Sequence, residues 1–322
     1  MISRRKLGLA ATGFTAVSAF AGPARADAAF PRKGKRAWAS QIQTLRIGLS
    51  GGENQGDRLG RYEDYRKLIE DTYEVPVKLF PAADYAGIIQ AFGASQIEMS
   101  FVGAAAYASA WIETKGNVEP LIVAREADGS VSYISVMVVR ADSGISKLED
   151  MKGKSLAFAD PNSTSGYLIP NFELKQGGID TASGKYFSRI GFGGGHEQAV
   201  VAVLQKQYDA ACTWASGQGE ESEGFSRGNL HEMYAKKLVK AGDLRIIWKS
   251  RPILNGPLTV RKDLPDDFKK DMTEFHLALA GAYPKIYQAV ERGGGQGYAV
   301  VKSEDFQLFI DLTNANRAAR RG

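Results

Sequence analysis

Short apolar runs and longer segments of helical periodicity alternate along most of this chain. The runs at 44–50 (TLRIGLS) and 75–82 (VPVKLFPA) have the length and the branched apolar residues of buried strands. Between them, residues 58–73 carry apolar positions three or four apart, which is typical of a helix. A strand, a helix and a strand in this order predict two parallel strands joined by a helical crossover. The pattern continues with helices at 83–95 and 104–116 and strands at 97–103, 119–127 and 132–140.

A second unit of the same kind begins near residue 147 and ends before the chain does. The C-terminal segment therefore has to pack back onto the first unit. We predict an α/β protein of two lobes joined by two crossings, near Ser135–Asp142 and Trp248–Pro257, with a ligand cleft between the lobes. The predicted parts are a loose basic arm at 27–43, a first lobe at 44–138 with 255–322, and a second lobe at 139–254.

The first 26 residues have the composition of an export signal. A basic start is followed by an uncharged stretch at 7–22 and by the small-x-small ending Ala24-Arg25-Ala26. The pair Arg4-Arg5 is typical of a twin-arginine signal, and an ordinary secretory signal that contains two arginines is the alternative. In either case we expect cleavage after about Ala26 and a periplasmic product.

The charge distribution and the cysteine and histidine content give no support for nucleic-acid binding or for a metal site. The net charge of +5 comes from the two ends of the chain, and the remainder holds 30 basic against 35 acidic residues, which gives no argument for nucleic-acid binding. The one cysteine, Cys212, lies in the apolar run DAACTW and is expected to be a buried thiol. Three histidines without Cys/His spacing predict no metal site, and we expect no cofactor.

The stretch DPNSTSGYL (160–168) lies between a predicted strand and a predicted helix. The first N–H groups of a helix lack internal partners and carry positive dipole charge, so an anion binds well there. Ser163, Thr164 and Ser165 add hydroxyl donors, and Gly166 lets the backbone approach a ligand closely. A simple N-cap is the alternative, since one hydroxyl residue suffices for that role. In the absence of a Lys or Arg, the stretch favours hydrogen bonding over charge capture.

This stretch resembles the motif of periplasmic phosphonate-binding proteins that serve ABC transporters, within the phosphate/phosphonate/phosphite-binding family. The segments ADYAGIIQAF, DGSVSYISVMVV and GGGHEQAVVAV resemble the same family in the same order, over residues 44–310. The resemblance implies a two-lobed periplasmic binding-protein fold, type II-like, that closes on a ligand in the cleft between the lobes. It also implies a membrane permease as partner and a monomer.

The resemblance further implies roles for six residues. The three hydroxyl residues Ser163, Thr164 and Ser165 would hold phosphonate oxygens at the helix N-terminus. Tyr85 would donate its phenol to the same oxygens from across the cleft, and Tyr133 would do likewise or wall the pocket. Core packing is the alternative for both tyrosines. His196 would donate a ring N–H to the anion, where a capping or core histidine is the alternative.

The sequence departs from the family where an amine-bearing tail would be held. Members that take aminoalkyl phosphonates are expected to carry carboxylates at positions that here hold Ser216 and Gly256. Neither residue balances an ammonium, although the acidic run at 220–223 lies close by. A phosphonate with a small or uncharged tail, phosphite or another phosphoryl compound is therefore expected. Further ligand-site candidates are Asn162, Glu53, Asn54, Ser216 and Asn255. We hypothesise that a buried Glu53 selects a ligand that still carries a proton.

Other functions compete with that of a solute receptor. Ser163, His196 and Asp209 could be arranged as a hydrolase triad, although Ser163 is not in a G-x-S-x-G turn. A sensor partner of a membrane receptor would share every feature above. So would a receptor for another small organic anion, such as a sulfonate or a carboxylate.

Overall fold

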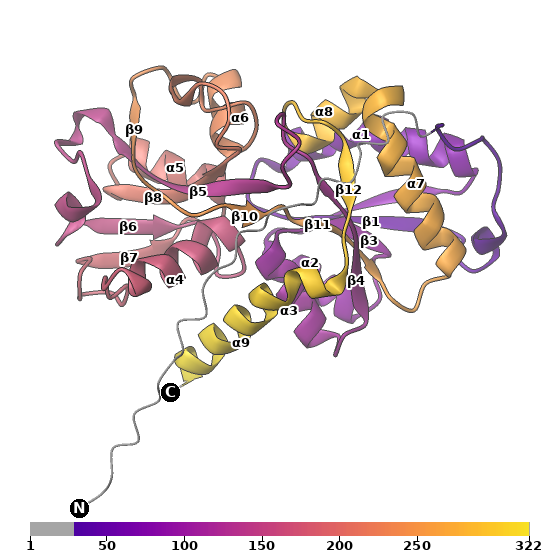
Figure 1. The fold of residues 1–322 in the computed structure, drawn as a ribbon, viewed down its shortest axis with the longest axis horizontal. Coiled ribbons are helices and arrows are strands. Elements are labelled where there is room, and N and C mark those ends of the chain that lie inside the picture. Colours follow the sequence, from indigo (N-terminus) through magenta and orange to yellow (C-terminus); the bar gives the residue numbers. More distant parts are fainter. Residues whose placement is uncertain (1–28, 322) are drawn as a thin grey trace, which may run out of the picture.

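The computed structural model describes residues 29–321, which form two lobes side by side (Figure 1). The predicted export signal, including Arg4-Arg5, lies outside the described residues. In the described part of the chain, no helix is both long and apolar enough to cross a membrane.

The first lobe is built on a six-stranded sheet in the order β12-β4-β11-β3-β1-β2. Strand β1 runs parallel to β2 and β3, whereas β11 runs antiparallel to β3 and β4. The helices α1, α2 and α3 follow β1, β2 and β3 in turn, as the βαβ pattern predicted. The strands are β1 (Leu45–Leu49), β2 (Val77–Pro81), β3 (Met99–Phe101), β4 (Val118–Ala124), β11 (Pro257–Arg261) and β12 (Tyr298–Val300). The helices are α1 (Gln55–Tyr73), α2 (Tyr85–Gly93), α3 (Ala104–Glu113), α7 (Asp266–Ala282), α8 (Pro284–Glu291) and α9 (Gln307–Arg321).

The second lobe has its own six-stranded sheet, in which β5 pairs with β8, β9 and β10. Residues of β5 at 136–139 are fully buried between the helices, which explains their unbroken apolar run. The strands are β5 (Ser132–Arg140), β6 (Ser155–Phe158), β7 (Arg189–Phe192), β8 (Ala210–Ala215), β9 (Leu244–Lys249) and β10 (Ile253–Leu254). The helices are the π-helical turn η4 (Thr164–Leu168), α4 (Ile169–Gln176), α5 (His196–Leu204) and α6 (Asn229–Ala235).

The sheets place the first crossing earlier than the sequence pattern did. Strand β4 ends at Ala124 in the first sheet, and β5 begins at Ser132 in the second. The crossing therefore lies at 125–131 rather than at Ser135–Asp142, and residues 132–138 belong to the second lobe. An apolar run shows that a strand is buried but not which sheet it joins. The chain returns at residues 255–256, between β10 and β11.

The N-terminal arm is packed at Phe30 and Trp38 rather than loose, although Arg32, Lys33 and Lys35 between them are exposed. Trp38 is fully buried, and its indole N–H donates to the Asp271 carboxylate at 2.7 Å. Phe30 packs its ring on Phe275, with 5.2 Å between ring centroids. The arm therefore seals one side of the first lobe beside α7.

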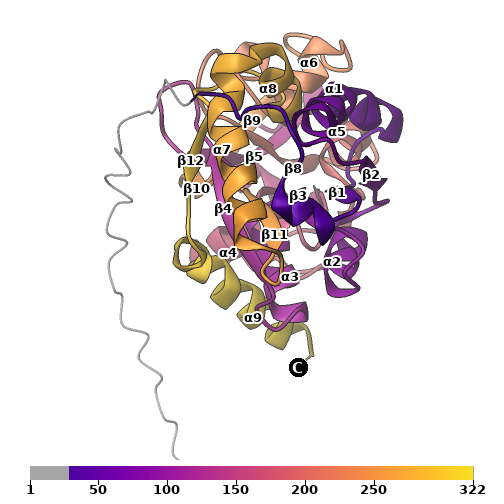
Figure 2. The same cartoon turned by 90° about the vertical axis from the view of Figure 1, so that its right-hand side faces the viewer.

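The C-terminal segment closes the first lobe and reaches the second. Residues 266–291 form two helices, α7 and α8, because the chain turns at Tyr283 ahead of Pro284. Helix α9 packs on α3 and contacts η4 of the second lobe, where the Tyr167 hydroxyl donates to Asn316 at 3.4 Å. Figure 2 shows α9 beside α3, apart from the sheet of the first lobe.

Candidate ligand-binding site

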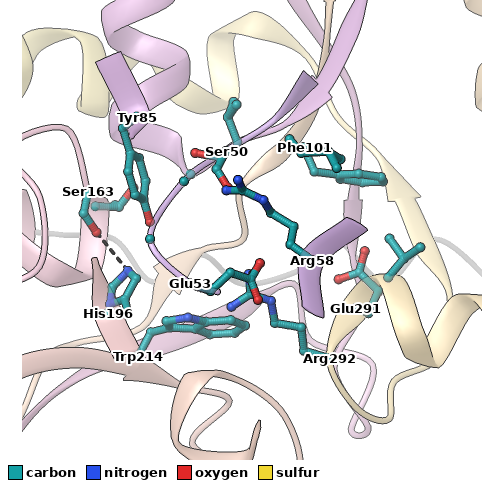
Figure 3. Close-up of a pocket in the computed structure, with 18 of the residues that line it drawn as sticks. Ser50, Glu53, Arg58, Tyr85, Phe101, Ser163, His196, Trp214, Glu291 and Arg292 are labelled. Carbon is teal, nitrogen blue, oxygen red and sulfur yellow. Dashed lines mark hydrogen bonds and ion pairs between the residues drawn. The ribbon is translucent and has the colours of Figure 1, made fainter. Parts of the chain in front are cut away.

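A cavity of about 180 Å³ lies between the two lobes. Strand ends and loops of both lobes line it, together with residues of the second crossing. This volume is small beside the roughly 300–1,000 Å³ of pockets for drug-sized ligands, so the cavity suits a small molecule. Figure 3 shows hydroxyl and histidine side chains on one side of it and arginine and glutamate side chains on the other.

All six residues assigned to the site by the family resemblance line this cavity: Tyr85, Tyr133, Ser163, Thr164, Ser165 and His196. The turn after β6 supplies the three hydroxyl residues, and each of them is at most 2% exposed. Ser163 adopts an extended backbone and its Oγ accepts the Gly166 N–H at 3.0 Å, which is N-cap geometry. Capping and cavity lining are therefore combined in one residue rather than being alternatives.

A chain of hydrogen bonds fixes which proton each group in this part of the cavity carries. The Asn229 amide donates to Thr213 Oγ1 at 3.0 Å. Thr213 is fully buried, and His196 Nδ1 at 3.3 Å is the one hydrogen-bond acceptor for its proton among the described residues, so we assign the proton to that bond. His196 Nε2 then carries the ring proton and donates to Ser163 Oγ at 3.0 Å. Ser163 Oγ thus accepts two hydrogen bonds, and its own proton remains available for a donation into the cavity.

His196 is neutral under ordinary conditions. Burial, together with the positive charge of Arg292, lowers the pKa of His196 to about 3. The imidazole is therefore not the positive charge that would attract an anion. In this structure its ring N–H reaches Ser163, so it positions the serine hydroxyl.

The two lobes meet at the hydroxyl residues. Thr164 Oγ1, from the second lobe, accepts the Ala105 N–H of α3 in the first lobe at 2.9 Å. This bond serves a helix whose own N-cap, Gly103, has no side chain to offer. Tyr85 comes from the first lobe, and burial raises the pKa of its phenol. Burial likewise raises the pKa of Tyr133.

The charged side of the cavity was not predicted from the sequence. Four arginines line it, contrary to the expectation of binding without charge: Arg58, Arg61, Arg227 and Arg292. They come from α1, from the loop before α6 and from the end of α8. Arg58 and Arg61 lie three residues apart on α1, so their side chains face the same side of the helix, and this spacing was the available signal in the sequence. The pattern could not show that this side faces a cavity.

Glu53 does not present a free carboxylate. Arg61 donates to both of its oxygens, at 2.8 and 2.5 Å, and Arg292 donates to Oε1 at 2.6 Å. Burial opposes ionisation of Glu53, but Arg292 and Arg61 outweigh it and lower its pKa to about 2. The hypothesis that Glu53 repels a fully ionised ligand is therefore wrong, because its charge is already balanced.

Arg227, which also lines the cavity, connects the two lobes through hydrogen bonds. It donates to both oxygens of Glu126 in the first crossing and to Asn255 in the second. Its remaining nitrogen donates to Glu291 of α8 at 3.0 Å. Asn255 therefore lines the cavity as expected, but as part of this network.

Three further candidates lie outside the cavity lining. Asn54 caps α1 through the Asp57 N–H, Asn162 Oδ1 accepts from Ser109, and Ser216 Oγ bonds Ser226. The acidic run at 220–223 is exposed. A side chain at Gly256, which does line the cavity, would place its Cβ 2.2 Å from the Val102 carbonyl oxygen, so no carboxylate fits there.

The triad arrangement does not form. The Asp209 carboxylate accepts the backbone N–H and the hydroxyl of Ser155, at 2.8 and 2.7 Å. The His196 nitrogen that an aspartate would orient bonds Thr213 instead. The general-base arrangement that a serine nucleophile requires is therefore absent from these residues.

Comparison with known proteins agrees with the motifs. The family model described as "ABC transporter, phosphonate, periplasmic substrate-binding protein" matches residues 48–306. The phosphonates-binding periplasmic protein of Escherichia coli is 31% identical over 93% of this chain and 80% of its own length. The phosphate-import protein PhnD of Mycolicibacterium smegmatis is 29% identical over 72% of this chain and 71% of its own.

A solved structure shares the fold. It is a binding-protein component of an ABC phosphonate transporter from Pseudomonas aeruginosa, with a TM-score of 0.70 and 26% identity over 84% of this chain and 87% of that one. The match of the family model covers most of the chain and the whole cavity lining. The protein therefore belongs to the family of periplasmic substrate-binding proteins of phosphonate ABC transporters, and it is a binding protein rather than an enzyme.

Proposed function

We propose that this protein binds a phosphonate or a related phosphorus oxyanion in the cavity between its lobes and delivers it to the permease of an ABC importer. The observation that carries this proposal is the orientation of Ser163. Its hydroxyl accepts from Gly166 and from His196, so its proton is directed to the cavity side. Tyr85 and Tyr133 add phenol donors beside it.

The mechanism is capture by closure. Hydrogen-bond donors from both lobes reach the same anion only when the lobes are closed. The anion therefore binds the closed form more tightly than the open form and shifts the equilibrium toward closure. A closed protein would then present one continuous surface to the permease. Export through the signal at residues 1–26, cleavage near Ala26 and a monomeric mature form complete the proposal.

Residues from the second lobe would hold the phosphonate oxygens, and Tyr85 would reach them from the first lobe. His196 would act through Ser163. The family also includes a relative named for phosphate import, so phosphate belongs among the ligands to be tested. A sulfonate or carboxylate ligand would use the same donors and is an outcome of the same test.

Calorimetric titration of the exported protein tests this function. The panel is methylphosphonate, phosphite, 2-aminoethylphosphonate, phosphate and sulfate, with the Ser163→Ala variant alongside. We expect a phosphorus oxyanion to bind with micromolar or tighter affinity and to be recovered chemically unchanged. The Ser163→Ala variant should bind it at least tenfold more weakly. Tight binding of sulfate alone, or of none of the five, would contradict the proposal.

A further inference from the structure

Among the described residues, three of the four arginines that line the cavity form ion pairs with carboxylates, and the fourth does not. Arg61 and Arg292 share the carboxylates of Glu53 and Glu232. Arg227 lies between two further carboxylates, those of Glu126 and Glu291. The fourth arginine of the lining, Arg58, forms no ion pair with any described residue.

Arg58 is nevertheless buried, with 3% of its surface exposed. Its two terminal nitrogens donate to backbone carbonyls, those of Ser50 and of Ala82, the latter at 2.9 Å. Its Nε–H has no hydrogen-bond partner among the described residues. A carbonyl satisfies a donor but does not neutralise a charge. The Glu53 carboxylate acts on Arg58 through its charge but is already ion-paired with Arg61 and Arg292, so the buried guanidinium has no carboxylate partner of its own in the described part of the chain.

Two more donors of the cavity lining are unsatisfied as well. The hydroxyl of Ser50 and the Nε–H of Arg61 also have no partner among the described residues, and both residues line the cavity. Buried polar groups are almost always hydrogen-bonded, so three donors without partners in one cavity lining favour a ligand with acceptor atoms. Figure 3 shows Arg58 beside Ser50, away from the side that holds Ser163 and His196.

An amine-bearing tail fits this part of the cavity poorly. Both oxygens of Glu53 already accept from arginines, and the oxygens of Glu291 accept from Tyr298 and Arg227. An ammonium would therefore meet guanidinium groups without a free carboxylate. An uncharged tail would leave the Arg58 charge buried and unpaired. A carboxylate would accept from Arg58 and Ser50 and would balance the charge.

We propose that the ligand is a phosphonate whose tail carries a second acidic group, most simply a carboxylate, which binds Arg58 and Ser50 while the phosphonate binds the hydroxyl residues. This inference rests on the phosphonate-binding function proposed above and specifies its substrate class. It also explains why Ser216 and Gly256 stand at the positions where relatives that take aminoalkyl phosphonates are expected to carry carboxylates. A carboxylate at those positions would bind a positively charged tail, whereas the tail proposed here is negatively charged.

Calorimetric titration with matched tails tests the inference. The compounds are phosphonoacetate, 3-phosphonopropionate, ethylphosphonate and 2-aminoethylphosphonate, which share the phosphonate group. We expect the better carboxylate compound to bind about 10- to 100-fold tighter than ethylphosphonate, as for a buried charge-assisted hydrogen bond. Arg58→Gln should reduce this ratio to a few-fold, and Arg58→Lys should restore part of it.

Arg66→Gln is the control, because Arg66 lies two turns farther along α1 and pairs with Glu63 and Glu70. It should leave the ratio unchanged. Equal or tighter binding of ethylphosphonate or 2-aminoethylphosphonate by the unmodified protein would overturn the inference while the proposed function stands. An unchanged ratio in a folded Arg58→Gln variant would overturn it too. Failure of all four compounds would also overturn the inference, and the proposed function would then stand or fall with methylphosphonate, phosphite and phosphate in the earlier panel.

Discussion

At the residue scale, the environment of a side chain decides its chemistry more than its type does. His196 would titrate near neutral pH in water, yet burial beside Arg292 keeps it neutral. Its two nitrogens have separate roles, because Thr213 donates to one and the other donates to Ser163. The histidine thus supplies orientation rather than charge.

Replacing His196 by alanine should weaken ligand binding by about 1–3 kcal/mol, because Ser163 loses the donor that fixes its hydroxyl. The loss should be the same at every pH between 5 and 8, since a group with a pKa of about 3 stays neutral across that range. Titration of methylphosphonate at pH 5.5, 6.5 and 7.5, with both proteins in the same buffers, measures the difference. A loss that grows steadily as the pH falls would mean that the histidine is protonated when the ligand binds.

At the element scale, two glycine loops bring the lobes into contact. The loop before α1 contains Gly52, and the loop before α5 contains Gly195. A Cβ on Gly195 would lie 2.2 Å from the Gly52 Cα and 2.5 Å from its carbonyl oxygen. The backbone of Gly195 is extended, with φ 169°, so a side chain is excluded by the opposite lobe and not by backbone strain.

Gly195→Ala should therefore hold the lobes apart in the liganded form. We expect ligand affinity to fall by about 1–3 kcal/mol, the usual cost of overpacking a close contact, with little change in the unfolding temperature of the ligand-free protein. Calorimetric titration and thermal unfolding measure the two effects. Gly281→Ala on α7 is the matched control, because a Cβ there meets nothing within 4 Å. Normal affinity in Gly195→Ala would show that the loops separate without cost.

Prediction from the sequence succeeded where a local pattern carries the information. Alternating strands and helices predicted both lobes, and the DPNSTSG turn predicted the hydroxyl side of the cavity. It failed where a contact joins distant segments. The partners of Arg227 lie at 126, 255 and 291, and no periodicity links those positions. The strand at 132–140 is read correctly as a strand, but its pairing with β8 and β9 is a property of the whole sheet.

At the scale of the whole molecule, Arg227 stabilises the arrangement of the lobes. It lies in the second lobe at 4% exposure and binds both crossings and α8 of the first lobe. The Arg227 guanidinium also lies over the ring of Trp214, in a cation–π contact with 5.3 Å between the guanidinium carbon and the ring centroid. Two buried carboxylates depend on this one cation, so the balance of charge here affects the stability of both lobes together.

Arg227→Met should destabilise the protein by about 3–5 kcal/mol at pH 8, because Glu126 and Glu291 lose their counter-charge while buried. Burial already raises the pKa of Glu291, and removing Arg227 raises it further. A carboxyl group with a raised pKa binds its proton more tightly in the folded state, so the destabilisation should become smaller as the pH falls toward 5. Urea unfolding at pH 5 and pH 8 measures this change.

Two further variants separate charge from packing in that experiment. Arg66→Met removes a surface arginine with two carboxylate partners and should cost about 1 kcal/mol or less. Glu126→Gln in the Arg227→Met protein removes one of the uncompensated charges and should recover part of the lost stability at pH 8. If the double variant is no more stable than Arg227→Met, and the deficit is equal at both pH values, the lobes are held by the packing of Arg227 against Trp214 and not by its charge. The expected recovery would instead identify the two carboxylates as the groups that make a cation at position 227 necessary.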